Sequence, residues 1–117
     1  MNVFGQNGSR PYTDISIDEY NTQFAGSDSD YLLLDVREVM EYESGHLPGA
    51  VNLPMSEFEA RFQAELPADK PIVLVCRTGV RSAQVAAYMA HVGGYGELYN
   101  LIDGTIKWAM RGLPLEY

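Results

Sequence analysis

Short apolar segments alternate along this chain with longer amphipathic segments, and this alternation constrains the fold more than any other feature. Four of the apolar segments suit strands, and they cover residues 31–34, 50–53, 72–75 and 98–101. Five segments beside them predict helices, at residues 17–24, 38–44, 56–66, 81–92 and 105–111. Strands and helices that alternate with short connections predict an α/β fold, a central parallel sheet with helices on both faces.

Length and composition fit one compact domain. The chain has 117 residues, of which 46% are apolar, enough to build one core, and this excludes an intrinsically disordered protein. Residues 1–11 are polar and rich in glycine and asparagine, so we expect a flexible tail followed by a single domain at residues 12–117. The N-terminus lacks the basic start and apolar stretch of a secretory signal, and no apolar run is long enough to span a bilayer. We therefore expect a cytoplasmic protein with no membrane partner.

The charge balance and the cysteine content exclude several classes of function. Lys and Arg together number 8 against 16 Asp and Glu, which gives a formal net charge of −8. A chain this acidic is not expected to bind nucleic acid or an anionic membrane surface. Cys76 is the single cysteine, which excludes an intrachain disulfide, a CxxC redox pair and a multi-cysteine zinc site.

Two residues with side chains suited to catalysis or binding come directly after predicted strands. Cys76 follows residues 72–75, the most β-prone segment of the chain, and Asp35 follows residues 31–34. In open parallel sheets, ligands bind just beyond the carboxyl ends of the strands. The sequence therefore predicts the ligand site at this edge. The simplest role for Asp35 is to pair with Arg37 or to cap the next helix.

The surroundings of Cys76 favour a reactive thiol. Residues 71–96 contain no Asp or Glu, and their only formal charges are Arg77 and Arg81. Arginine and a helix N-terminus both lower the pKa of a cysteine, and the thiolate is the nucleophilic form. The amides of the loop can also form a nest for an anion, with Gly79 supplying the backbone freedom. The alternative is a buried core cysteine, which composition alone favours.

Several motifs resemble those of the single-domain rhodaneses, a family of sulfurtransferases. The N-terminal motif covers residues 34–38, 41–42, 45–50 and 52–54, the active-site loop covers 76–82, and the C-terminal motif covers 103–104 with Trp108, Gly112 and Pro114. The resemblance extends over nearly all of residues 12–117. One departure is Asp103, which stands where the family often has a glycine.

The resemblance implies a rhodanese-like three-layer fold and a double-displacement reaction. The Cys76 thiolate would attack the outer sulfur of an anionic donor such as thiosulfate, form a persulfide, and pass this sulfur to cyanide or a thiol. The loop residues that would bind the donor and cradle the persulfide are Arg77, Thr78, Gly79, Val80 and Arg81. Asp35, Arg37 and Ser82 would support the loop. The resemblance also allows a protein as sulfur donor or acceptor, and it implies no metal and no organic cofactor.

Two other functions stay open. Phosphatases and arsenate reductases of this fold have an arginine six positions after the cysteine, whereas here Arg81 comes five positions on and Ser82 takes the sixth place. The shorter loop favours a sulfur atom over a tetrahedral phosphate. The chain could instead be a non-catalytic or relay module that docks to a sulfur-trafficking partner, and formation of a persulfide on Cys76 would separate the two.

Overall fold

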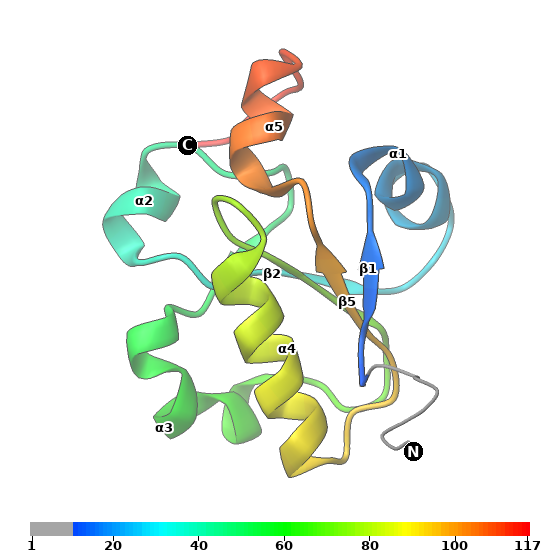
Figure 1. Cartoon of the computed structure of the whole chain (residues 1–117), viewed down its shortest axis with the longest axis vertical. Helices are drawn as coiled ribbons and strands as arrows, with labels where there is room; N and C mark the ends of the chain where they lie inside the picture. The colour runs from blue at the N-terminus through cyan, green and yellow to red at the C-terminus, as the bar shows by residue number, and fades with distance from the viewer. Residues whose placement is uncertain (1–10) are drawn as a thin grey trace.

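The structure is a computed structural model that describes residues 11–117, so the predicted flexible tail at residues 1–11 lies outside the described residues except for Pro11. Five strands make one sheet: β1 (Thr13–Ile15), β2 (Leu32–Asp35), β3 (Val51–Asn52), β4 (Ile72–Val75) and β5 (Leu98–Leu101). The helices are α1 (Ile17–Tyr20), continued by the π-helical turn η2 (Asn21–Ala25), then α2 (Val39–Glu43), α3 (Met55–Glu65), α4 (Val80–Val92) and α5 (Gly104–Met110). Figure 1 shows their arrangement.

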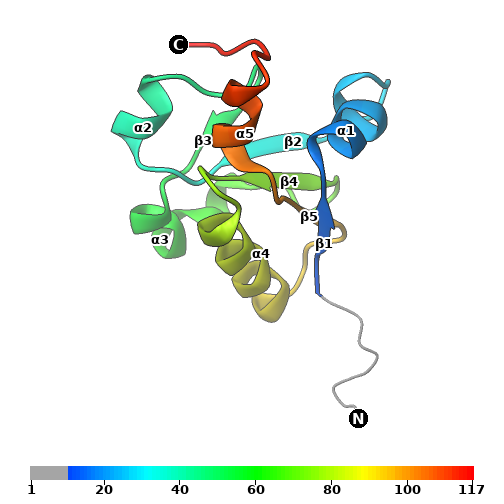
Figure 2. The same ribbon diagram turned by 45° about the horizontal axis from the view of Figure 1, so that its top comes forward.

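The predicted α/β fold is confirmed. The strand order is β1-β5-β4-β2-β3, and every pairing in the sheet is parallel. In Figure 2, α1 and α5 lie on one side of the sheet and α3 and α4 on the other. β4 is the middle strand, as the apolar segment 72–75 predicts, and its four residues are all fully buried. Cys76 therefore follows directly after the middle strand.

The two faces of the sheet bury separate cores. Ile72 and Leu74 of β4 belong to the cluster under α3 and α4, whereas Val73 and Val75 belong to the cluster under α1 and α5. This division follows from the strand itself, because successive side chains point to opposite faces. With both faces covered, the backbone that leads to Cys76 is fully buried.

β1 is the strand that the sequence analysis missed. It has three residues, and only Ile15 of these is buried, so no apolar run marks it. Its pairing with the edge of β5 provides the hydrogen bonds that define it. The segment from residue 17 does begin as a helix with Ser16 as N-cap, and Ser16 and Glu19 form a capping box.

In the part of the chain that the structure describes, no helix combines the length and the apolar character needed to cross a membrane.

Candidate active site

Cys76 lies at the carboxyl end of β4, where the chain turns into α4. Only 1% of its surface is exposed. The loop is tied to the start of α5, because the amide of Thr105 donates to the carbonyl of Cys76 at 2.9 Å and that of Ile106 to the carbonyl of Arg77 at 3.1 Å. The cysteine is thus fixed by the middle strand on one side and by α5 on the other.

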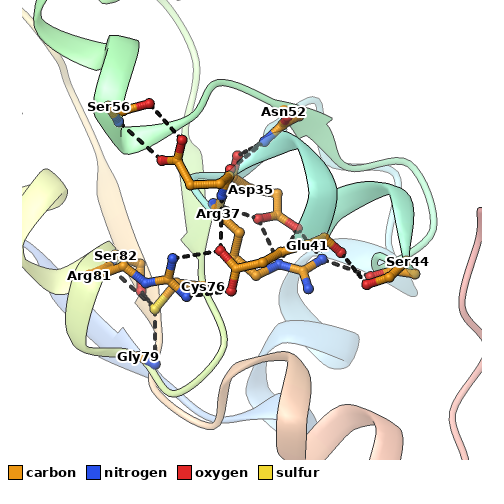
Figure 3. Close-up of polar contacts among 12 residues, drawn as sticks. Asp35, Arg37, Glu41, Ser44, Asn52, Ser56, Cys76, Gly79, Arg81 and Ser82 are labelled. Carbon is orange, nitrogen blue, oxygen red and sulfur yellow. Dashed lines mark hydrogen bonds and ion pairs between the residues drawn. The ribbon is translucent and has the colours of Figure 1, made fainter.

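The loop curls around the sulfur so that hydrogen-bond donors converge on it (Figure 3). The Gly79 amide lies 3.1 Å from Cys76 Sγ, and both the amide and the hydroxyl of Ser82 lie 3.3 Å from it. Burial raises the pKa of the Cys76 thiol, but the hydrogen bonds from Ser82, Thr78 and Gly79 lower it more, and the resulting pKa is below the ordinary value. This geometry favours a thiolate.

Gly79 makes the curl feasible. Its φ of 86° lies in the left-handed region that side chains with a Cβ adopt only at a cost. A Cβ built on Gly79 would also come within 2.5 Å of the carbonyl oxygen of Ile102. The predicted need for glycine at this position therefore has two physical reasons, backbone conformation and space.

The two arginines of the loop differ in their surroundings. Arg81 donates two hydrogen bonds to Glu41 of α2, with Nη1–Oε1 at 2.8 Å and Nη2–Oε2 at 2.9 Å, so a carboxylate balances its charge. The hydrogen bond from Arg81 is the main cause that lowers the pKa of Glu41 to about 2. Arg77 is exposed, and within residues 11–117 its side chain has no hydrogen-bond or ion-pair partner. The sequence led us to expect two free guanidiniums beside the cysteine. In the structure, the Arg77 guanidinium is free within the described residues and the Arg81 guanidinium is paired with Glu41.

A buried hydrogen-bond chain extends from the sulfur toward β1. Ser82 Oγ lies 2.6 Å from Asn100 Oδ1, and the amide nitrogen of Asn100 donates to the carbonyl of Gly79 at 3.2 Å and to Asp14 Oδ1 at 3.1 Å. Asn100 is only 2% exposed. The Ser82 hydroxyl has one hydrogen, so it can donate to Asn100 or to Cys76 but not to both.

Asp35 and Arg37 form a fully buried pair. Arg37 Nη2 lies 2.8 Å from Asp35 Oδ2, Nε lies 3.0 Å from both carboxylate oxygens, and Nη2 also donates to the carbonyl of Gly45 at 2.7 Å. Within the described residues, Asp35 makes no hydrogen bond to the loop 76–82. It therefore has the simple pairing role that we expected, and its carboxylate orients the Arg37 guanidinium.

Of the two remaining predicted loop residues, Thr78 contributes through its backbone amide. The Thr78 and Val80 side chains are exposed, and among residues 11–117 only Thr78, Gly79 and Ser82 donate hydrogen bonds to the sulfur. Sequence reasoning missed Glu41 and Asn100. The one available signal for Asn100 was an amide inside the otherwise apolar segment 98–101.

Comparisons with known proteins agree on one family. The family model described as the rhodanese-like domain matches residues 16–111. A sulfurtransferase of Allochromatium vinosum is 43% identical over 86 residues, which are 74% of this chain and 78% of that protein. YrkF of Bacillus subtilis, provisionally named a sulfur carrier protein, is 36% identical over 95 residues, and the match covers 81% of this chain but only 50% of YrkF. The crystal structure of a rhodanese-related protein from Thermoplasma volcanium superposes with a TM-score of 0.76 at 26% identity, covering 90% of this chain and 98% of that one.

Proposed function

This chain belongs to the rhodanese-like domain family, and from that premise we propose that it is a sulfurtransferase that carries a sulfane sulfur as a persulfide on Cys76. Sulfur transfer is the activity that the match to a named sulfurtransferase supports at the level of the family. The observation that carries the proposal is the convergence of the Gly79 and Ser82 donors on one buried sulfur at 3.1–3.3 Å.

The loading step is a nucleophilic displacement. The Cys76 thiolate attacks the outer sulfur of thiosulfate, a new S–S bond forms, the bond between the two donor sulfurs breaks, and sulfite leaves with the electron pair. The amides of Thr78, Gly79 and Ser82 stabilise negative charge on the sulfur, because they are fixed before the reaction and need no reorientation. Arg77 and Arg81 attract the anionic donor. Arg77 contributes more to this attraction, because Glu41 neutralises the charge of Arg81.

The unloading step restores the resting enzyme. A second nucleophile, cyanide or a thiolate, attacks the outer sulfur of the persulfide, and the electron pair of the broken S–S bond returns to Cys76 Sγ. No proton has to move through the protein in either step when both nucleophiles are ionised. This double displacement requires one thiol, and the chain has one.

The ion pair of Arg81 argues against phosphatase or arsenate-reductase chemistry. Those reactions need a guanidinium that reaches over the loop to hold a tetrahedral anion. Here the guanidinium nearest the end of the loop already makes two hydrogen bonds to Glu41. The six-residue loop and this ion pair both favour a sulfur atom.

Thiocyanate formation from thiosulfate and cyanide tests the proposal against the relay alternative. The wild-type protein should form thiocyanate with multiple turnovers, and Cys76→Ser should form none. A protein that accepts sulfur from a protein persulfide but forms no thiocyanate from thiosulfate would instead be a relay module. Sulfur-trafficking protein partners, suggested by the name of YrkF, belong to that second outcome.

A further inference from the structure

The side chains of Asp14 and Asn100 connect the edge strand β1 to the face of the sheet on which Cys76 lies. The two residues are partners in the parallel pairing of β1 with β5. Successive side chains of a strand point to opposite faces of a sheet, and Ile15 and Leu101 belong to the core under α1 and α5. Asp14 and Asn100 therefore point to the other face, and Cys76 belongs to the core on that face.

The amide group of Asn100 is held in one orientation. Its nitrogen Nδ2 has two hydrogens and donates to Asp14 Oδ1 at 3.1 Å and to the carbonyl of Gly79 at 3.2 Å. Its oxygen Oδ1 therefore faces Ser82, whose Oγ lies 2.6 Å away. Asn100 is only 2% exposed, and a reversed amide would place its oxygen against two acceptors, so this orientation is strongly favoured.

The orientation of Asn100 determines what the Ser82 hydroxyl can do for the sulfur. The single hydrogen of this hydroxyl has two acceptors within reach, Asn100 Oδ1 at 2.6 Å and Cys76 Sγ at 3.3 Å. When Cys76 is a thiol, its own hydrogen can go to the Ser82 oxygen while the hydroxyl donates to Asn100. When Cys76 is a thiolate, the sulfur needs a donor, and the hydroxyl has to leave Asn100. An Asn100 oxygen that is held toward Ser82 therefore favours the thiol over the thiolate.

We infer that Asp14 is a positioning residue for Cys76, because it holds the Asn100 amide and thereby sets how much of the Ser82 hydrogen bond reaches the sulfur. Asp14 acts through two intervening side chains, and its effect is to limit the thiolate fraction of the resting protein. As a statement about sulfur transfer, this inference rests on the proposed function, since loading needs the thiolate.

The charged groups around the cysteine act by a separate route. Arg81 of α4 interacts electrostatically with Cys76, with Glu41 of α2 and with Asp35 of β2. Arg77 is exposed. Among residues 11–117, none of these four charged groups makes a hydrogen bond to either of the two side chains that link β1 to the sulfur. A change at Asp14 therefore leaves the hydrogen bonds of these groups in place.

The experiment measures the thiolate by its ultraviolet absorbance during a pH titration, with the spectrum of Cys76→Ser subtracted. No reagent then has to reach a sulfur whose residue is only 1% exposed, and the chain has no other cysteine. At a fixed pH below the midpoint, Asp14→Ala should raise the ratio of thiolate to thiol about two- to tenfold, the range that corresponds to one hydrogen bond of ordinary strength. A ratio equal to that of wild type, or below it, would overturn the inference.

Asp28→Ala is the matched control for charge. Asp28 is an exposed residue in the turn before β2, and its substitution changes the net charge by the same amount. The ratio of thiolate to thiol in Asp28→Ala should equal that of wild type. An increase as large as that in Asp14→Ala would mean that net charge causes the effect, and the inference would fail.

A double-mutant cycle tests the route through Asn100. In an Asn100→Ala background the intermediate acceptor is gone, so adding Asp14→Ala should change the ratio by less than about twofold. A direct effect of the Asp14 charge on the sulfur would persist in that background at full size and would refute the positioning role. Ser82→Ala is the second background, for use where Asn100→Ala does not fold, because it removes the hydroxyl through which Asp14 acts.

Asp14→Asn keeps an acceptor oxygen for the Asn100 amide and removes only the charge. Its ratio should lie between those of wild type and Asp14→Ala, and a ratio as high as that of Asp14→Ala would contradict a role based on the hydrogen bond. Loading with thiosulfate separates this inference from the proposed function. A protein that titrates as expected but takes up no sulfur refutes only the proposed function, whereas one that loads sulfur but whose titration ignores Asp14→Ala refutes only the role of Asp14.

Discussion

Arg81 and Glu41 lie 40 residues apart in the sequence and form a bidentate ion pair, with both N–O distances under 3 Å (Figure 3). The pair joins the start of α4 to α2 beside the cysteine loop. Both side chains are about one-third exposed, so we expect the pair to contribute less than about 1 kcal/mol to stability. Its larger effect is electrostatic, because it removes one positive charge from the entrance of the candidate active site.

Glu41→Gln should improve binding of an anionic donor. The substitution keeps the size of the side chain but leaves the charge of Arg81 unbalanced. The KM for thiosulfate should fall by about two- to fivefold, the change that corresponds to an exposed ion pair. Glu43→Gln is the matched control, because Glu43 is an exposed residue of the same helix and the change in net charge is the same. Identical KM values for the two variants would show that Arg81 does not meet the donor.

Ser82→Ala should raise the pKa of Cys76. The Ser82 hydroxyl lies 3.3 Å from the sulfur and shares its single hydrogen between the sulfur and Asn100 Oδ1. The share that goes to the sulfur is among the causes that lower the pKa of Cys76. Because the thiolate is the reactive form, the pH profile of alkylation by iodoacetamide should move to higher pH. Ser56→Ala, at an exposed serine of α3, should leave the profile where it is. A profile in Ser82→Ala that coincides with wild type would exclude the hydroxyl as a donor to the sulfur.

Asn100→Ala should shift the same profile in the opposite direction. Asn100 Oδ1 competes with Cys76 for the single hydrogen of Ser82, at 2.6 Å. Without this acceptor the hydroxyl turns to the sulfur and stabilises the thiolate, so alkylation should begin at lower pH. A shift to higher pH would mean that Asn100 acts mainly by holding the carbonyl of Gly79 in place.

Gly79→Ala should be far more harmful than Gly49→Ala. The two glycines have nearly the same φ, 86° and 83°, but a Cβ on Gly79 would meet the Ile102 carbonyl whereas one on Gly49 has nothing within 4 Å. Gly49→Ala should cost about 1–2 kcal/mol of unfolding free energy, the cost of the backbone conformation alone. Gly79→Ala should cost more in urea unfolding and should also slow sulfur loading. Equal losses of stability would show that the loop shifts to make room.

The sequence was sufficient to predict those parts of the fold that are determined by the local pattern of apolar residues. The apolar segment 72–75 identified the middle strand and placed Cys76 at its carboxyl end, and both predictions are confirmed as positions in the structure. β1 could not be predicted in this way, because Thr13 and Asp14 carry no apolar signal and the strand is defined by its partner β5.

The position of the candidate active site could be predicted from the sequence, but the pairing of its charged and polar side chains could not. The loop residues 76–82 are contiguous, so their motif showed where the sulfur would lie. Glu41 and Asn100 reach the loop from α2 and β5, and no local pattern reports such contacts between distant segments. For the same reason, Arg81 was expected as a free cation. The sequence also suggested that guanidinium charge lowers the pKa of Cys76. The leading causes that lower it in the structure are hydrogen bonds, and the charge of Arg81 interacts with Cys76 as well.

The most direct test of the central claim is the mass of the intact protein after incubation with thiosulfate and removal of excess donor. The account predicts a gain of one sulfur atom in wild type, located on the peptide that contains Cys76, and no gain in Cys76→Ser. Cyanide should return the wild-type mass to its starting value. A wild-type protein whose mass does not change, or a Cys76→Ser variant that still gains sulfur, would contradict the account.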